Sequence, residues 1–484
     1  MTVTKARTFR NILYTSLGRG LTLVCTGLTS LVVARNLTPS DYGVVGFAGI
    51  VISFLSQFSD IGVGNAVIRR PEITQRNLDT ALTLKILLGC GAFVIALLIA
   101  PFSHHFFEHP ATGNVIRVLG LNFLISSIGF VPSVMLTREM NYRALMVPGV
   151  LSAVVQCILA VTLVLHGWSF WAVVVASVGA TLTSGIILQL AKRFPIRLSF
   201  DWTIAQEYLR FGIPLFASGV LGFLIFNLDN LLVGASMGSA QLGYYALAFT
   251  WGSFICGLLF STVNGVLFPA FSAIQNDLEA ARRWYLKTVE LVAFIAVIAN
   301  GALFANAPCF LVTFLGKGSS KWLPATMALR ILCVYGVLRA VTEPLAPFLL
   351  ARGRTKTLLY ASTLAGTVEV ALLLLALRLG RIEMVAGAVL IAYASQTVIY
   401  LPYLRREYSI GLKDIIAKIW PVIPAFGMGW LITALLPSSF GDTFNTLCIR
   451  GLLTASVVGL THGIFSRFRC FHEAGGMILQ NFAR

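Results

Sequence analysis

Several charged side chains lie inside long apolar stretches of this 484-residue sequence, where charge is otherwise rare. They include Arg19, Lys85, Arg117, Asp229, Arg330, Arg339, Glu343, Glu369 and Arg450. An ionised group held away from water is costly unless it has a partner or faces a wet cavity. Arginine binds phosphate oxygens through two parallel hydrogen bonds and keeps its proton. The arginines therefore indicate an anion site, and the acids indicate sites for a cation or a proton.

The four candidate anion-binding arginines differ in their depth within the apolar stretches. Arg19 and Arg339 lie deepest, and Arg19 stands between Gly18 and Gly20, small residues that let a bulky ligand approach the backbone. Arg117 and Arg330 lie near the edge of their stretches, where a long side chain can also extend to water. We expect all four to contribute to a cationic cavity; a structural pair between Arg19 and an acid on another helix is the alternative.

Three acids are candidates for ion coupling or gating. Glu343 follows Arg339 by four residues, so on a helix the two side chains share a face and can pair, and Pro344 breaks the backbone ladder directly afterwards. This unit is either a gate or a neutralised structural pair. Glu369 is the only charge in its stretch and suits a proton-coupling site or a static hydrogen bond. Asp229 suits ion coupling, a helix cap or a hydrogen bond between helices.

Two sequence patterns bear on catalysis and cofactors: a zinc-binding pattern and the P-loop pattern of ATP-hydrolysing proteins. His105, Glu108 and His109 match an H-x-x-E-H zinc pattern, but they lie in a short segment between Pro101 and Pro110 and no later helix offers an obvious third ligand. No G-x-x-x-x-G-K-[ST] sequence is present, which excludes ATP hydrolysis through a P-loop. We expect no metal, no cofactor and no enzymatic activity.

The elements that must position these residues are membrane helices. The sequence is 57% hydrophobic and only 11% charged, with a mean hydropathy of +0.84, far from the roughly 25% charge of soluble domains. Apolar stretches long enough to cross a bilayer as helices recur along the chain. We predict an all-α polytopic membrane protein with about fourteen transmembrane helices: Ile12–Val33, Gly43–Phe58, Thr80–Ala100, Val115–Leu136, Ala144–Leu165, Ser169–Leu190, Phe211–Val233, Gly243–Leu267, Val289–Leu315, Ala325–Leu350, Leu358–Leu377, Met384–Leu404, Ile419–Leu436 and Leu447–Phe465.

The net charge of +17 follows the connections between these stretches. Basic residues gather in alternate connections, beginning with Lys5, Arg7 and Arg10, whereas the opposite connections hold few. By the positive-inside rule both termini and every basic loop face the cytoplasm. The positive charge therefore reflects membrane topology and does not indicate a nucleic-acid partner.

An internal repeat appears at a shift of 200 residues. The segment Ala34–Gly43 aligns with Gly234–Gly243, and each joins a long outgoing helix to a returning one. We predict two six-helix pseudo-repeat bundles, residues 1–198 and 199–408, followed by an extra helix pair and a cytoplasmic tail in residues 409–484. Six spans in each bundle make the repeats parallel, with a central cavity between them.

The order of several loose motifs makes the chain resemble the oligosaccharide flippases of the multidrug/oligosaccharidyl-lipid/polysaccharide exporter superfamily. The motifs are Ala34–Gly43, Asp60–Arg69, Leu136–Arg143, Arg210–Pro214, Asn227–Asn230 and Leu242–Tyr245. The resemblance implies that the protein flips polyprenyl-diphosphate-linked oligosaccharide repeat units across the bacterial inner membrane for exopolysaccharide, capsule or O-antigen synthesis. It also implies membrane lipid, a polysaccharide polymerase and export machinery as partners, and a first-helix arginine that faces the cavity.

Two other functions stay open. A membrane-embedded polysaccharide polymerase, ligase or glycosyltransferase would bind the same lipid diphosphate, but it needs acid-base or metal chemistry, and the outer connections are short and poor in carboxylates. A drug antiporter of the same superfamily would share the two-bundle plan. Its cationic ligands would require acids where this chain has arginines.

Overall fold

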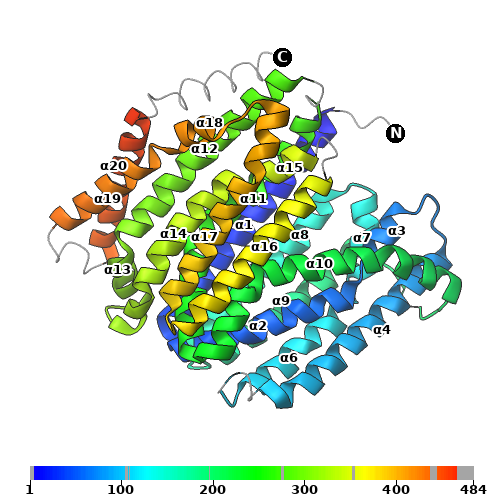
Figure 1. Ribbon diagram of the computed structural model, residues 1–484. Coiled ribbons are helices and arrows are strands. Elements are labelled where there is room, and N and C mark those ends of the chain that lie inside the picture. The colour runs from blue at the N-terminus through cyan, green and yellow to red at the C-terminus, as the bar shows by residue number, and fades with distance from the viewer. Residues whose placement is uncertain are drawn as a thin grey trace. The chain divides into compact units, whose positions relative to one another are not determined.

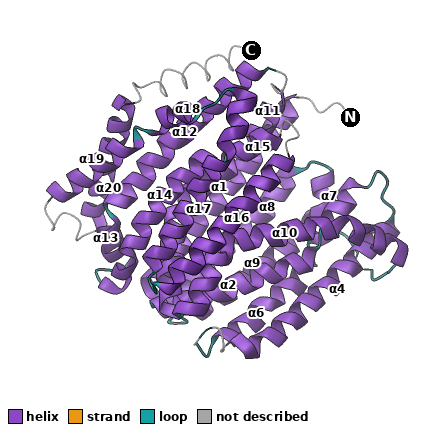
Figure 2. Cartoon of the chain, in the orientation of Figure 1, coloured by secondary structure: helices purple, strands orange, loops and turns teal. Residues whose placement is uncertain are grey.

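The structure is a computed structural model, and it describes residues 5–103, 107, 109–195, 197–273, 277–350, 355–436 and 444–465. Within these residues the secondary structure is helical and contains no strand (Figure 2). The chain divides into two compact units, Met1–Gly243 and Tyr244–Arg484. Each unit is described by itself, and the predicted bundle boundaries at residues 198 and 408 stay predictions.

The first unit is built from long helices joined by short turns (Figure 1). In chain order they are α1 (Lys5–Asn36), α2 (Pro39–Asp60), α3 (Val63–Arg69), α4 (Gln75–Ile99), η1 (Ala100–Phe102), α6 (Thr112–Ile125), α7 (Phe130–Arg138), α8 (Tyr142–Leu165), α9 (Phe170–Ala191) and α10 (Trp202–Met237). Helix α8 packs against both α1 and α9. Helix α2 packs against α4, α6 and α10.

The second unit contains most of α11 (Ser239–Ala273), which begins in the first. It continues with α12 (Leu278–Ala305), α13 (Ala307–Cys309), the π-helical turn η2 (Phe310–Leu315), the 3₁₀ turn η3 (Ser320–Ala325), α14 (Thr326–Thr342), α15 (Leu345–Leu350), α16 (Thr355–Arg378), α17 (Ile382–Tyr408), α18 (Leu412–Ile419), α19 (Val422–Leu435) and α20 (Phe444–Phe465). Helix α12 is central here, since it packs against α14, α17, α18, α19 and α20.

Short polar residues explain where several helices begin. Thr38 caps α2 by accepting a hydrogen bond from the Asp41 amide, and Pro39 occupies the first turn, where its missing N–H costs nothing. Asp201 caps α10 and Asp277 caps α12 in the same way. These caps satisfy amide groups that no helical carbonyl can reach.

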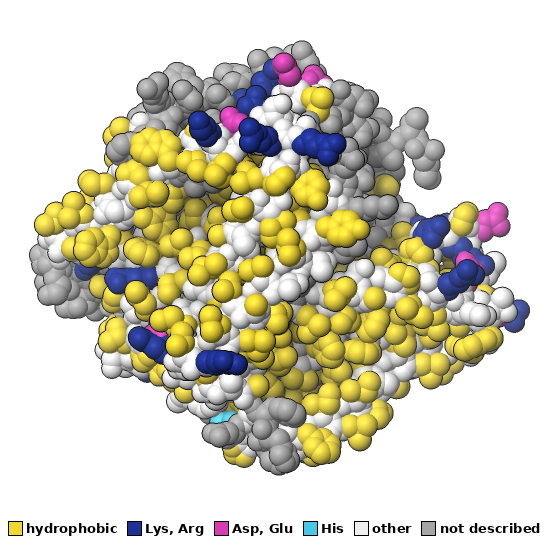
Figure 3. All heavy atoms as spheres, viewed as in Figure 1, with side chains coloured by type: hydrophobic (Ala, Val, Ile, Leu, Met, Phe, Trp, Pro, Cys, Tyr) yellow, Lys and Arg dark blue, Asp and Glu magenta, His cyan; other side chains and the backbone are white. Residues whose placement is uncertain are grey.

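The helices confirm a multi-pass membrane protein. Ten described helices are long and apolar enough to cross a bilayer, and twelve if the bent pairs Thr112–Arg138 and Trp202–Met237 each count as one. Helices α1 and α11 cover the two remaining predicted spans, Ile12–Val33 and Gly243–Leu267. Hydrophobic side chains cover the middle of the helices on the face in Figure 3, with Lys and Arg towards their ends. The count of fourteen and the cytoplasmic termini stay predictions.

Several predicted spans differ in detail from the observed helices, and the span Ala325–Leu350 is divided into α14 and α15. Val115–Leu136 is broken into α6 and α7, which meet at 52°. Helix α10 begins at Trp202 rather than Phe211 because Asp201 caps it there, and it bends by 54° near its middle. Helix α12 ends at Ala305, and Pro308 follows it within α13, where a proline cannot continue the hydrogen-bond ladder.

The two segments that the predicted repeat relates, Ala34–Gly43 and Gly234–Gly243, contact each other within the first unit. A Cβ on Gly43 would lie 1.9 Å from the Ser239 carbonyl oxygen, and one on Gly243 would lie 1.9 Å from that of Pro39. The hydroxyl oxygens of Ser40 and Ser239 are 2.7 Å apart. Since residues related by the shift of 200 make reciprocal contacts, the starts of α2 and α11 pack as local counterparts, and only glycine allows this distance.

Candidate functional site

Arg19 lies on an exposed face of α1, about seven residues and therefore roughly 10 Å into its predicted span. Its neighbour Gly18 is buried, and a Cβ there would lie 2.5 Å from Met146 Cγ on α8. On the other side, a Cβ on Gly20 would meet nothing within 4 Å. Gly18 therefore packs closely against α8, whereas the Cβ position of Gly20 faces open space.

The other two candidates in the first unit have different surroundings. Arg117 is exposed on α6 and donates a 2.8 Å hydrogen bond to the Asn114 side chain. Asp229 is buried in α10, and its Oδ1 accepts hydrogen bonds from the backbone and side-chain amides of Asn230. The contact to Asn230 agrees with a local structural role for Asp229, whereas Arg117 is accessible to an anion.

In the second unit, Arg339 and Glu343 form the pair that their spacing predicts. Arg339 Nε lies 2.9 Å from Glu343 Oε1, and the two side chains are 18% and 13% exposed. The Tyr393 hydroxyl on α17 donates a 3.4 Å hydrogen bond to the same carboxylate oxygen. Next to it, the hydroxyl oxygens of Thr342 and Thr397 are 2.9 Å apart. The pair therefore belongs to a polar contact between α14 and α17.

Arg330 does not join this pair. It lies nine residues before Arg339 on α14, so the two arginines project from opposite sides of the helix. Its guanidinium lies 5.7 Å from the centre of the Phe304 ring, and its Nε donates to the Phe304 carbonyl oxygen at 3.4 Å. Arg330 thus packs against α12, whereas Arg339 faces α17.

Glu369 is half-buried on α16. This side chain is therefore only partly shielded from its surroundings. Its role in ion coupling stays a prediction, as do the substrate-binding roles of the four arginines and the gating roles of Glu343 and Asp229.

Two further charges inside predicted spans have clear structural contacts. Lys85 on α4 is buried and donates hydrogen bonds to the Ser59 carbonyl oxygen and hydroxyl at 2.9 and 3.1 Å. Arg450 on α20 is buried and donates to the Thr433 carbonyl oxygen at 2.7 Å. Each joins neighbouring helices, which is the expected way to stabilise an intramembrane cation.

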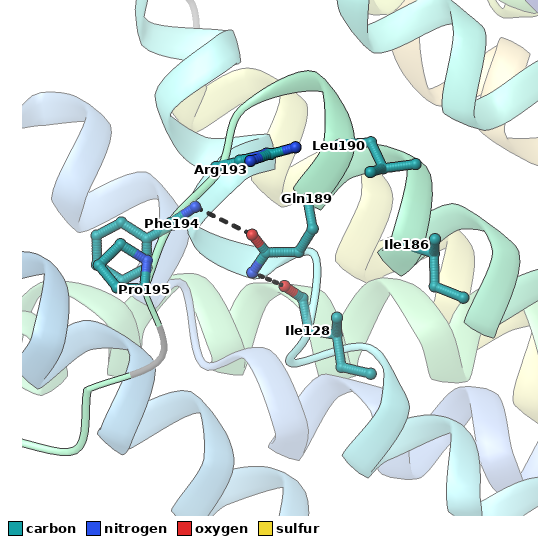
Figure 4. Close-up of a pocket in the computed structure, with 7 residues that line it drawn as sticks. All are labelled: Ile128, Ile186, Gln189, Leu190, Arg193, Phe194 and Pro195. Atoms are coloured by element: carbon teal, nitrogen blue, oxygen red, sulfur yellow. Dashed lines mark hydrogen bonds between the residues drawn. The ribbon is translucent and has the colours of Figure 1, made fainter.

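A pocket of about 580 Å³ opens in the first unit, where α9 ends (Figure 4). Gln189 connects two segments that line the pocket. Its Nε2 donates a hydrogen bond to the Ile128 carbonyl oxygen, and its Oε1 accepts one from the Phe194 amide. The lining is Ile128, Ile186, Gln189, Leu190, Arg193, Phe194 and Pro195. These mostly apolar walls suit a hydrocarbon chain better than a sugar, and none of the candidate residues lies among them.

The zinc pattern finds no support in the described residues. His105 and Glu108 lie outside them, while the ring of His109 packs against Phe170 and its Nδ1 accepts a hydrogen bond from the Ala111 amide. Among the residues that the structure describes, no group of three His, Cys, Asp or Glu side chains could hold a metal ion.

Comparison with known sequences matches most of the chain to polysaccharide biosynthesis proteins. The family described as "Polysaccharide biosynthesis protein" matches residues 32–327. The lipopolysaccharide biosynthesis protein WzxC of Escherichia coli K12 is 24% identical over 406 residues, covering 80% of this chain and 79% of that protein. The succinoglycan biosynthesis transport protein ExoT of Rhizobium meliloti is 23% identical over 364 residues, covering 74% and 72%.

Comparison with solved structures identifies the fold. The lipid II flippase MurJ, in an inward closed conformation, superposes with a TM-score of 0.73, covering 95% of this chain and 99% of that one at 15% identity. At that identity the likeness concerns the helical architecture alone.

Proposed function

Because this chain belongs to the polysaccharide biosynthesis protein family, which matches more than half of its length, we propose that it flips polyprenyl-diphosphate-linked oligosaccharide units across the bacterial inner membrane. The family and the fold favour transport over an enzymatic reaction. The translocated unit moves from the cytoplasmic to the periplasmic leaflet and supplies exopolysaccharide, capsule or O-antigen synthesis. A polymerase and the export machinery act on it afterwards.

The observation that carries this proposal is the exposed Arg19 on a predicted transmembrane helix. A diphosphate carries negative charge that must leave water on its way through the membrane, and a guanidinium compensates that charge with directed hydrogen bonds. The open space beside Gly20 leaves room for the attached sugar. An anionic headgroup fits these features better than the cationic ligand of a drug antiporter.

The proposed mechanism is alternating access around a cationic central cavity, in which the headgroup enters the cavity and the lipid tail stays in the bilayer. Arg19 and Arg117 supply exposed positive charge from the first unit. Arg339 is neutralised by Glu343 in the described conformation, so it reaches a diphosphate only if that pair opens. The pair therefore suits a gate that the substrate opens by competing for the guanidinium.

The test is the sidedness of the lipid-linked oligosaccharide in cells that lack the protein. Accumulation in the cytoplasmic leaflet, reversed by the wild type, would support flipping; correct sidedness without the protein would overturn it. Correct sidedness together with unpolymerised units would instead favour a polymerase.

Substitutions at Arg19 then test the site. Arg19→Ala is expected to abolish export while the protein still inserts, and Arg19→Lys to retain part of it, because lysine keeps the charge and loses the two-point contact. Arg143→Ala removes an exposed arginine at the start of α8 and serves as the control. Wild-type export by Arg19→Ala would remove this residue from the substrate site.

A further inference from the structure

Helices α12 and α20 of the second unit pack against one another in opposite directions. Phe294 contacts His462 at one end of this interface, and Asn306 contacts Thr454 further along. Between them, a Cβ on Gly301 would lie 3.0 Å from Val458. The helices thus approach closely over several turns, and the side chains between them are shielded from solvent and lipid.

This interface contains more polar groups than a membrane helix contact requires. Glu290 and Asn306 of α12 are both 4% exposed, and Thr454 and His462 of α20 are both 0% exposed. Asn306 Nδ2 donates to Thr454 Oγ1 at 3.1 Å. Because buried polar groups in a membrane are expensive, a concentration of them in one interface indicates a function.

His462 is the least satisfied of these side chains. Its ring lies 5.3 Å from the ring of Phe294, and neither Nδ1 nor Nε2 has a hydrogen-bond partner among the described residues. Glu290 lies one turn before Phe294, on the same face of α12, and interacts electrostatically with His462. A carboxylate and an imidazole are therefore buried together, on helices far apart in the sequence.

The other charged groups around this pair are identified by the helices that pack on α12 and α20. Helix α19 and the turn η2 contain no titratable residue, and α20 itself adds only Cys448 and Arg450. Lys287 lies one turn before Glu290 on α12. Three other helices pack on α12, and their charged residues are Arg330 and Arg339 in α14, Lys413, Asp414 and Lys418 in α18, and Glu383, Arg405 and Arg406 in α17.

Three of these neighbours have recorded contacts elsewhere. Asp414 pairs with Arg282 at 3.2 Å, Arg339 with Glu343 at 2.9 Å, and Arg330 packs on Phe304. Helices α14 and α17 also contain a titratable cysteine and five tyrosines, which are Cys333, Tyr335, Tyr393, Tyr400, Tyr403 and Tyr408. Apart from Lys287, Glu290 is thus the charged group placed to act on His462.

We infer that Glu290 and His462 form a proton-binding site in the second unit, between α12 and α20. An imidazole next to a buried carboxylate gains a favourable charge partner when it binds a proton. When the proton leaves, the site keeps the carboxylate and an uncharged ring. Proton uptake therefore changes the electrostatic attraction between α12 and α20.

The site also offers a source of energy. The sequence contains no P-loop, so transport must use an ion gradient or the supply of substrate. Proton exchange at Glu290 and His462 would connect the proton gradient to the packing of α12 on α20. This coupling rests on the proposed function, whereas proton binding itself does not.

Histidine ¹⁵N NMR of the purified full chain in lipid nanodiscs tests the site. Spectra are recorded from pH 3 to 8 for the wild type, His462→Gln and Glu290→Gln, and His462→Gln identifies the resonance of His462. We expect that resonance to titrate in the wild type, and Glu290→Gln to bind the proton at least tenfold more weakly. A His462 resonance that does not change over this range, or one with the same midpoint in Glu290→Gln, would overturn the inference.

His166→Gln is the matched control, since His166 is an exposed histidine at the end of α8 whose Nδ1 lies 2.7 Å from the Thr162 carbonyl oxygen. It should leave the His462 titration unchanged. If Glu290→Gln does not fold, Glu290→Asp replaces it, and a His462 midpoint in folded Glu290→Asp that equals the wild-type midpoint counts against the site.

Export in cells tests the coupling separately. We expect Glu290→Gln and His462→Gln to reduce export at least tenfold while Arg19→Ala leaves the His462 titration unchanged. If His462 titrates in the wild type while both variants export like the wild type, the coupling is refuted and the proton site stays in place. Wild-type sidedness of the oligosaccharide in cells without the protein would refute the proposed function alone.

Discussion

The pair of Arg339 and Glu343 allows a test that separates structural pairing from substrate binding. Exposed pairs four residues apart on a helix contribute only about 0.3 to 0.5 kcal/mol, but these side chains are 18% and 13% exposed. With charge centres about 4 Å apart and an effective dielectric constant near 20, the attraction is about 4 kcal/mol. Removing one partner of a buried pair costs about 3 to 5 kcal/mol, since it leaves the other charge uncompensated.

We therefore expect Arg339→Gln and Glu343→Gln each to lower the free energy of unfolding by about 3 kcal/mol. Arg339→Gln leaves the carboxylate with the Tyr393 hydroxyl, which replaces only part of the lost interaction. The double variant should lose much less than the sum of the two, with a coupling energy above about 1 kcal/mol.

The assay is reversible unfolding in mixed detergent micelles of the wild type, the two single variants and the double variant. Oligosaccharide export is measured for the same four proteins. A coupling energy below about 0.5 kcal/mol would refute the buried-pair interpretation. Export separates the remaining alternatives. If the stable double variant exports normally, the pair is structural; if it does not export, Arg339 or Glu343 has the proposed role in gating.

Three further predictions concern stability and use the same unfolding assay. Gly43→Ala should lower the free energy of unfolding by about 1 to 3 kcal/mol, because its Cβ would lie 1.9 Å from the Ser239 carbonyl oxygen. Gly49→Ala is the control and should be neutral or slightly stabilising, since its Cβ would meet nothing within 4 Å. Equal effects of the two substitutions would contradict the close packing at Gly43. Gln189→Leu should lower the free energy of unfolding by about 1 to 3 kcal/mol, because the Ile128 carbonyl and the Phe194 amide would lose their hydrogen-bond partner. An unchanged free energy of unfolding would argue against a stabilising role for these two hydrogen bonds. Asp201→Ala should lower the free energy of unfolding by about 1 kcal/mol, because it removes the cap of α10. Asp201→Asn should keep most of that free energy, since asparagine is also a good helix cap.

Much of the architecture could be predicted from the sequence because the bilayer imposes a simple length requirement on every apolar stretch. The described helices fall on the predicted spans, and the spacing of Arg339 and Glu343 predicts their contact, since residues four apart share a helical face. The break between α6 and α7 escaped prediction. Pro132 in the first turn of α7 lacks the N–H that would bond the Ile128 carbonyl oxygen, and the Gln189 side chain donates to that oxygen instead.

The candidate site could be predicted only as a set of charges. Depth within a span separates arginines that can extend to water from those that cannot, but it does not say which side of a helix faces a neighbour. Arg330 and Arg339 illustrate this, since one contacts Phe304 and the other contacts Glu343. Glu290 and His462 escaped prediction because each lies near the end of a span, where an ionisable residue is ordinary.

The sequence by itself determined that this chain is a multi-pass membrane protein and that its arginines and acids are unusual, because apolar length and charge are local properties. It also indicated that residues near Gly43 and Gly243 are equivalent. Only the tertiary structure decided that these glycines pack against each other's backbone, and that Glu290 and His462 are buried together. Contacts between distant segments depend on how whole helices pack, and a single sequence carries no local signal for that arrangement.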